Sequence, residues 1–114
     1  MNYQEPADRA RTAQLAKLAA PEAQAWFKFD HAVEREDGHI PRKYRELMAV
    51  TAALTAQCAY CIDRHVRAVQ QLGVAAEEIA EATMIAAAIR SGATLGHGLL
   101  ALKIMEDAEK GQAA

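Results

Sequence analysis

The middle of the chain carries two successive helical repeats of apolar residues. The first recurs at the spacing of one helix face between Arg42 and Gln57, and the second runs from Ile62 to Leu72 and stops at Gly73. A glycine directly after a helical repeat is typical of a helix C-terminus. Neither Gly nor Pro lies between the two repeats, so the apolar pattern alone does not locate a turn between them.

Composition supports a fold made of helices alone. Alanine, the strongest helix former, accounts for 27 of the 114 residues, against one Trp, two Phe and three Tyr. Residues 1–114 are expected to form a single all-α domain, because this length suits one domain. A core rich in alanine buries little area per residue, so stability should depend on close helix packing and on contacts between subunits.

Two helices are predicted before the first repeat, over residues 6–20 and 21–35. Pro6 and Pro21 suit the first turn of each helix, where a missing N–H costs nothing. The second is the most aromatic segment of the chain, with Trp26, Phe27, Phe29 and Val33, so we expect it to anchor the core. The segment "EDGHIP" then predicts a turn.

Two further helices are predicted over residues 74–92 and 93–111, with Ser91-Gly92 as the break between them, giving about six in all. Between Ile79 and Met105 the only formal charges are Glu81, Arg90 and Lys103. Helices this apolar are usually buried on more than one side. Part of this surface is therefore expected to face another copy in a homo-oligomer.

Charge and hydropathy exclude several classes of partner. The formal net charge is -2 and the isoelectric point is near 6.1, which argues against nucleic acid or anionic lipid. The polar N-terminus does not resemble a secretory signal. The longest uncharged apolar run, residues 91–102, falls short of the ~20 residues that span a membrane. A cytoplasmic protein is expected, where a cysteine pair is more often catalytic or metal-binding than a permanent disulfide.

The segment "CAYCIDRH" holds both cysteines of the chain. If a helix begins at Cys58, a step of about 100° per residue puts Cys58, Cys61 and His65 on its apolar face. A thiol at a helix N-terminus faces unpaired N–H groups and the positive end of the dipole, which favours the thiolate. The imidazole can accept a proton or stabilise the anion. These residue types predict a redox dithiol.

Glu46 joins this group only if the chain reverses direction. In one continuous helix, Glu46 and His65 would be about 28 Å apart. If one helix ends by Gln57 and the next begins at Cys58, the two side chains lie level on facing antiparallel helices. A glutamate bonded to the imidazole would then fix its tautomer and raise its basicity. The predicted site and the predicted hairpin are one hypothesis.

Two other readings of the cysteines remain. A structural zinc site would use Cys58, Cys61 and His65 with a fourth ligand from His31, His39 or His97, although a second close-spaced ligand pair is absent. A structural disulfide would close a short loop and contribute only about 2 kcal/mol. His31 is otherwise expected on a solvated helix face and His39 in the turn, and His97 is assigned no role.

The segment "RELMAVTAALTAQCAYCIDRHVRAVQQLG" resembles the alkylhydroperoxidase D-like, carboxymuconolactone decarboxylase family. Its redox branch has a glutamate, eleven residues and then C-x-x-C-x-x-x-H, which Glu46, Cys58, Cys61 and His65 match. The flanks "DGHIPRKYRELMAV" and "QQLGVAAEEIAEA" extend the resemblance over about residues 22–105.

The resemblance implies an all-helical homo-oligomer, a trimer or hexamer, that reduces peroxides without a bound cofactor or metal. It implies that Cys61 is oxidised to sulfenic acid, that Cys58 donates the proton and then forms the redox disulfide, and that His65 and Glu46 relay the proton. An external dithiol, often a lipoylated protein, restores the pair.

One position departs from well-studied members, which have a histidine where this chain has Tyr60. The decarboxylases of the family lack the cysteine pair, so the pair argues against a decarboxylase. A non-catalytic helical binding subunit is the other alternative.

Overall fold

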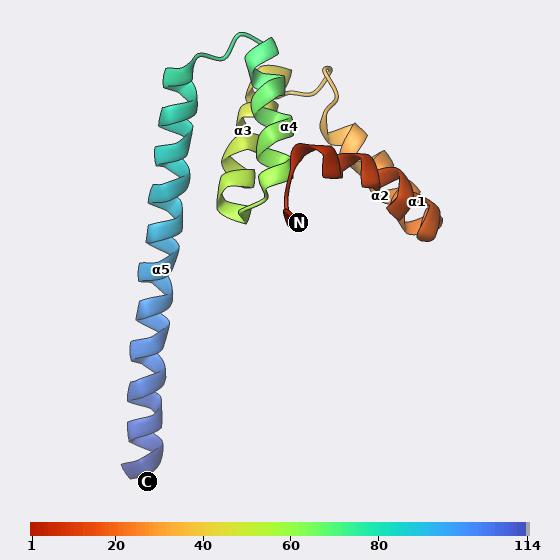
Figure 1. Cartoon of the computed structure of the whole chain (residues 1–114). Coiled ribbons are helices and arrows are strands. Elements are labelled where there is room, and N and C mark those ends of the chain that lie inside the picture. The colour runs from red at the N-terminus through yellow and green to blue at the C-terminus, as the bar shows by residue number, and fades with distance from the viewer. Residues whose placement is uncertain (114) are drawn as a thin grey trace.

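The computed structural model describes residues 1–113, and these residues form helices joined by short loops, without a strand (Figure 1). The all-α prediction is therefore confirmed. In chain order the elements are the 3-10 helix η1 (Pro6–Arg11) and the α-helices α1 (Thr12–Leu18), α2 (Ala20–Val33), α3 (Arg42–Ala56), α4 (Ala59–Gln71) and α5 (Ala76–Ala113).

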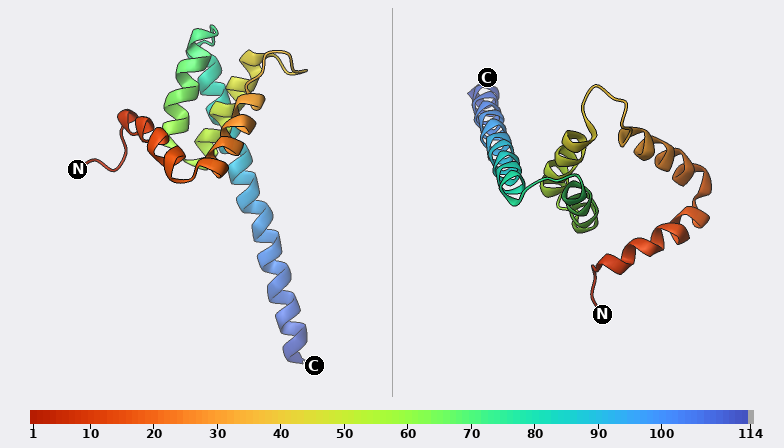
Figure 2. Two further views of the ribbon diagram at one scale, coloured as in Figure 1. Left: turned by 90° about the vertical axis from the view of Figure 1, so that its right-hand side faces the viewer. Right: turned by 90° about the horizontal axis from the view of Figure 1, so that it is seen from above.

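The predicted hairpin is formed by α3 and α4, which lie side by side and antiparallel (Figures 1 and 2). Helix α3 ends because Gln57 adopts the left-handed conformation, with φ 59° and ψ 46°. Cys58 returns to extended backbone and is the N-cap of α4. The turn is therefore made by a glutamine in a conformation that glycine and asparagine adopt more readily, which explains why no Gly or Pro marks it.

The end of α4 matches the sequence pattern. Gly73 has φ 82°, which is the left-handed conformation that a residue after a helix commonly adopts. The N–H of Val74 donates to the carbonyl of Val69 at 3.0 Å, as in a Schellman motif. This tight end lets the chain turn back so that α5 packs on α3.

The core lies among α3, α4 and the first turns of α5. Val50 and Val69 are 1% exposed and pack with Val74. Four partly buried residues surround them, namely Leu47, Leu54, Val66 and Ile79. Ala82 and Ala86 are the buried residues of α5 and let its backbone approach α3 closely. The core is small because each of its members is small.

The prediction that the aromatic helix anchors the core is wrong. None of the residues of α2 is buried, and Trp26, Phe29 and Val33 are largely exposed. Helix α2 packs against α1, and the two helices arch away from the hairpin (Figure 2). Its hydrogen bonds to α3 and α4 involve the Val33 carbonyl, Asp30 and the C-cap residue Glu34. None of its aromatic side chains belongs to the core.

The "EDGHIP" turn lies between α2 and α3 as predicted, and hydrogen bonds from Arg45 stabilise it. The Arg45 guanidinium donates to the carbonyls of Ile40 and Val33, both at 2.9 Å. A Cβ added at Gly38 would overlap this guanidinium, so a larger residue there would displace the Arg45 side chain from the turn.

The predicted break at Ser91-Gly92 is also wrong, because α5 is one helix of 38 residues. The hydroxyls of Ser91 and Thr94 donate to carbonyls of the preceding turn of α5, at 2.9 and 3.2 Å, rather than ending the helix. An interior glycine costs only about 1 kcal/mol relative to alanine, which the surrounding strong helix formers offset.

Helix α5 is far less buried than its composition predicts. Beyond Ala86, its residues through Gln112 are all exposed. Over Ala76–Gln112, with a mean hydropathy of 1.3 in its most apolar window, it is long and apolar enough to cross a membrane by length and composition. The twelve-residue run considered in the sequence therefore understated its apolar length.

Candidate active site

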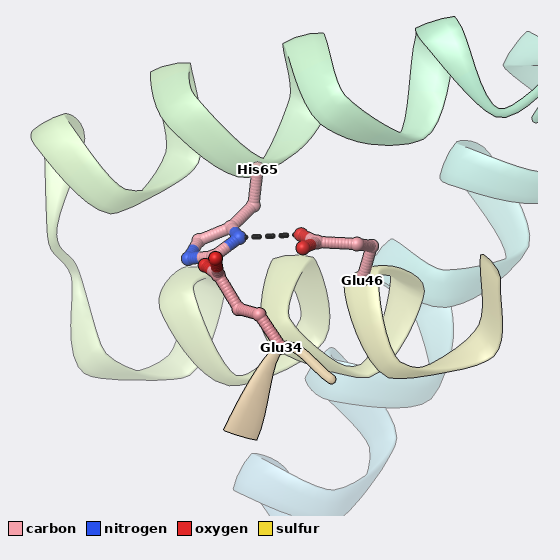
Figure 3. Close-up of side chains that lie close together, drawn as sticks. All are labelled: Glu34, Glu46 and His65. Atoms are coloured by element: carbon pink, nitrogen blue, oxygen red, sulfur yellow. Dashed lines mark hydrogen bonds and ion pairs between the residues drawn. The ribbon is translucent and has the colours of Figure 1, made fainter. Parts of the chain in front are cut away.

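Glu46 and His65 meet across the α3–α4 hairpin, as the spacing predicts. The Nδ1 of His65 lies 2.7 Å from Oε2 of Glu46, although the residues are 19 positions apart in the chain (Figure 3). Because a carboxylate accepts, the Nδ1–H of the imidazole donates to it. This hydrogen bond leaves Nε2 as the ring nitrogen that can accept a proton.

Glu46 is a buried carboxylate with both oxygens bonded. It is 2% exposed. Its second oxygen, Oε1, accepts from Nε of Arg42 at 3.2 Å and lies 3.1 Å from Nη2 of the same guanidinium. A buried charge is stable only when it is paired and hydrogen-bonded, and Arg42 supplies that pairing from one turn earlier in α3.

Cys58 and Cys61 are free thiols at the first turn of α4, and both are partly buried. The Sγ of Cys58 accepts the backbone N–H of Cys61 at 3.3 Å, so Cys58 caps the helix with its sulfur. Helix α4 begins where the sequence places it, and it begins with this sulfur facing the unpaired N–H groups of the helix end.

The two thiols differ in acidity. The side-chain hydrogen bond from Cys61 and its backbone N–H lower the pKa of the Cys58 thiol. The same side-chain hydrogen bond, together with burial, raises the pKa of the Cys61 thiol, which Arg64 partly offsets. In the reduced dithiol, Cys58 is therefore the more acidic thiol and Cys61 the less acidic one. This order agrees with the helix-terminus argument and is the reverse of the order that the family resemblance implies.

His65 follows Cys61 by four residues on α4, so the two side chains share one face of the helix. The less acidic thiol is thus the one nearer to the imidazole along the helix. Four side chains from two facing helices form the candidate site: Glu46, Cys58, Cys61 and His65.

Two acidic side chains from α2 and its C-cap, which the sequence did not indicate, also lie near the site. Arg64, next to His65, binds Asp30 at 3.2 Å and Glu34 at 2.5 Å. The Glu34 carboxylate also reaches the Glu46–His65 pair, since ligand atoms of the three residues lie within 4.8 Å of one another (Figure 3). No pattern in the sequence links residue 34 to residue 65, because the link depends on how the 34–41 loop returns the chain. Arg42, in contrast, lies four residues before Glu46 and was detectable as a helical ion pair.

The geometry gives the zinc alternative little support. Among residues 1–113, the one group of three metal-capable side chains is Glu34, Glu46 and His65, which does not include the cysteines. His31, His39 and His97 are exposed and do not join Cys58 and Cys61.

Tyr60 is hydrogen-bonded to the N-terminal segment. Its hydroxyl donates to Oδ2 of Asp8 at 2.9 Å, and this hydrogen bond raises the pKa of the Tyr60 phenol. An ion pair joins Arg9 to Asp63 at 3.3 Å. The residue that replaces the histidine of well-studied members thus helps to hold the N-terminal segment against α4.

Comparison with known proteins adds a family match. The carboxymuconolactone decarboxylase family profile matches residues 20–103. Uncharacterized protein 4 in the cox locus of Paracoccus denitrificans is 35% identical over 71 residues, covering 62% of this chain and 64% of that protein. The alkyl hydroperoxide reductase AhpD of Rhizorhabdus wittichii is 28% identical over 103 residues, covering 77% of this chain and 60% of that protein. The chain thus spans less than two thirds of the length of either relative.

Solved structures share the fold. A protein from Methanobacterium thermoautotrophicum superposes with a TM-score of 0.68 at 26% identity, over 74% of this chain and 93% of its own. A protein from Thermotoga maritima gives 0.63 at 28% identity, over 95% and 96%. A carboxymuconolactone decarboxylase family protein from Legionella pneumophila, in its apo form, gives 0.58 at 30% identity, over 71% and 74%.

Proposed function

Because the chain belongs to the carboxymuconolactone decarboxylase family, we propose that it is a thiol-dependent peroxidase that uses the Cys58–Cys61 dithiol. The observation that carries the proposal is the 2.7 Å contact of Glu46 with His65, which lies on the same helix α4 whose N-terminal turn holds two free cysteines. The similarity to an alkyl hydroperoxide reductase supports it.

The proposed reaction begins at the ionised sulfur. The thiolate of Cys58 attacks one peroxide oxygen, the O–O bond breaks, and the sulfur becomes a sulfenic acid while the other oxygen leaves as alcohol or water. The lowered pKa of the Cys58 thiol supports this order over attack by Cys61.

The second step uses the thiol that kept its proton. His65 accepts the proton of Cys61 at Nε2, and Glu46 stabilises the imidazolium through Nδ1. The Cys61 sulfur then attacks the sulfenic sulfur, the S–O bond breaks, and the hydroxide leaves as water with the proton from His65. One dithiol and one hydroperoxide thus become one disulfide, one alcohol and one water.

Regeneration requires two electrons from outside the chain. We propose an external dithiol, such as that of a lipoylated protein, which exchanges with the Cys58–Cys61 disulfide through a mixed disulfide. The proposal also includes a homo-oligomeric state and a cytoplasmic location, where such reductants are kept reduced.

The test is turnover of hydrogen peroxide and an organic hydroperoxide with dihydrolipoamide as reductant. Cys58→Ser and Cys61→Ser should each abolish turnover, whereas Asp37→Asn, in the exposed loop before α3, should leave it unchanged. A reagent for sulfenic acid should label Cys58 in Cys61→Ser. Turnover that survives both serine variants would remove the peroxidase proposal, and a label on Cys61 in Cys58→Ser alone would reverse the order of the sulfurs.

A further inference from the structure

The chain exposes much more surface than a compact protein of its mass. Its accessible area is 9172 Å², whereas about 6,100 Å² is expected for a compact 12.4 kDa monomer. The radius of gyration is 19.9 Å, against about 13 Å for a globular chain of this length. The excess of about 3,000 Å² is more than the roughly 1,000–2,500 Å² that one subunit buries in a single obligate interface, so it is enough area for a stable contact with another copy.

Part of the excess accessible area lies on two apolar stripes. The α5 stripe consists of Leu95, Leu99 and Leu102, spaced along one face of the exposed half of α5, and Leu95 and Leu99 are 74% and 71% exposed. The α2 stripe consists of Trp26, Phe29 and Val33, spaced in the same way on α2. The residues of both stripes are exposed, and none of them belongs to the buried core of the described residues.

The two stripes cannot meet within one chain. Helix α5 and the α1–α2 arch lie on opposite sides of the α3–α4 hairpin (Figure 2). The α5 stripe can therefore reach an α2 stripe only in another molecule. We infer that the α5 stripe of one copy packs on the α2 stripe of a second copy, an interface that goes beyond the oligomeric state already proposed by naming its two faces.

A lipid bilayer fits the surfaces less well. Arg90, in the middle of α5, donates to the carbonyl of Thr55 at the end of α3, so a spanning α5 would bring the hairpin into the bilayer. Arg90 and Lys103 would also both be buried, about 20 Å apart along the helix. A bilayer around α5 would leave the α2 stripe exposed, whereas a second copy covers both stripes.

The interface would also hold the site together. Asp30 and Glu34, which bind Arg64 beside His65, lie next to the α2 stripe on the same helix. Since polar contacts alone join α2 to the hairpin, a partner helix packed on the α2 stripe fixes α2 in the orientation that brings Glu34 to the site. This consequence rests on the proposed function, whereas the interface itself does not.

The experiment uses light scattering at micromolar concentration together with the emission of Trp26, the only tryptophan of the chain. The wild type should have a mass that is a multiple of 12.4 kDa and an emission maximum typical of a buried indole. Leu99→Glu should lower the mass at least twofold and move the emission to longer wavelength, and Phe29→Glu should lower the mass likewise.

Ala101→Glu is the matched control, because residue 101 lies on the face of α5 that carries Arg90, Thr94 and His97. It should leave both readouts unchanged. A monomeric wild type would overturn the inference, and so would Leu99→Glu lowering the mass without moving the Trp26 emission. Monomeric protein that binds neutral phosphatidylcholine vesicles through Leu99 would assign the α5 stripe to lipid instead. These readouts are independent of peroxide turnover, so either proposal can fail alone.

Discussion

Arg42 directs two nitrogens to one oxygen of Glu46: Nε donates a hydrogen bond at 3.2 Å, and Nη2 completes the ion pair at 3.1 Å. The other oxygen is thereby left to His65, at 2.7 Å. The carboxylate is shared between a permanent cation and a titratable base, and it is buried. The proposed relay thus depends on Arg42, a residue that does not touch the dithiol.

Replacing Arg42 by glutamine should destabilise the fold. The Glu46 charge would stay buried without its cation, so we expect the free energy of unfolding in urea to fall by about 2 kcal/mol. Lys43→Gln is the control, since Lys43 makes only a partly exposed ion pair with Glu78 at 3.8 Å. Its effect should stay below about 0.5 kcal/mol. Equal effects of the two variants would show that the buried pairing of Glu46 is not special.

Glu46→Gln should lower the rate of peroxide turnover without changing the shape of the side chain at position 46. Glutamine keeps the shape of the side chain but cannot stabilise an imidazolium, so peroxide turnover should fall by about 100-fold. Glu81→Gln, an exposed residue of α5, should have no effect. Stopped-flow oxidation followed by tryptophan emission would measure this difference. An unchanged rate of disulfide closure in Glu46→Gln, the step in which His65 takes the Cys61 proton, would exclude the carboxylate from the relay.

The acidity of Cys58 should depend on the side chain at position 61. Serine at 61 keeps a hydroxyl donor to the Cys58 sulfur, whereas alanine removes it, and this hydrogen bond is the largest cause of the lowered pKa of the Cys58 thiol. A lower pKa moves the midpoint of iodoacetamide alkylation to lower pH. The midpoint should therefore be below the ordinary thiol range in Cys61→Ser and higher in Cys61→Ala. Identical midpoints in the two variants would contradict the assigned hydrogen bond.

The tie between Tyr60 and Asp8 should depend on pH. The hydrogen bond to Asp8 raises the pKa of the Tyr60 phenol, so the folded protein holds this proton more tightly than the unfolded chain. The stabilisation is present below the unfolded pKa and is lost as pH rises through the folded pKa. Phenolate absorbance in a Tyr3→Phe, Tyr44→Phe background should titrate at lower pH after Asp8→Asn. Asp37→Asn should leave that titration unchanged.

The hairpin was predictable because chemistry and geometry require the same turn. Glu46 and His65 pair only if the chain reverses between them, and Cys58 suits a helix N-terminus. The sequence could not show that Gln57 makes the turn, because a left-handed glutamine has no pattern of its own. Glu34 was hidden for a related reason, since a loop and not a periodic repeat brings it to His65.

The errors in α2 and α5 share one physical cause. Aromatic and leucine-rich stripes predict burial, but they do not say which molecule buries them. In α5 a run of strong helix formers also outweighed Ser91 and Gly92, whose intrinsic preferences are weak beside those of their neighbours. Periodicity therefore gave the helix faces correctly and their partners incorrectly.

Helix α5 is a rod of about 57 Å, because each of its residues adds about 1.5 Å. One point on this rod, Arg90, is bonded to the carbonyl of Thr55, three residues before Cys58. The first half of α5 also packs on α3 through Ala82 and Ala86, so the exposed second half is connected to the turn before Cys58 by this packing and by Arg90. A molecule bound to the far end of α5 is thereby connected, through α5 and Arg90, to the turn that carries Cys58.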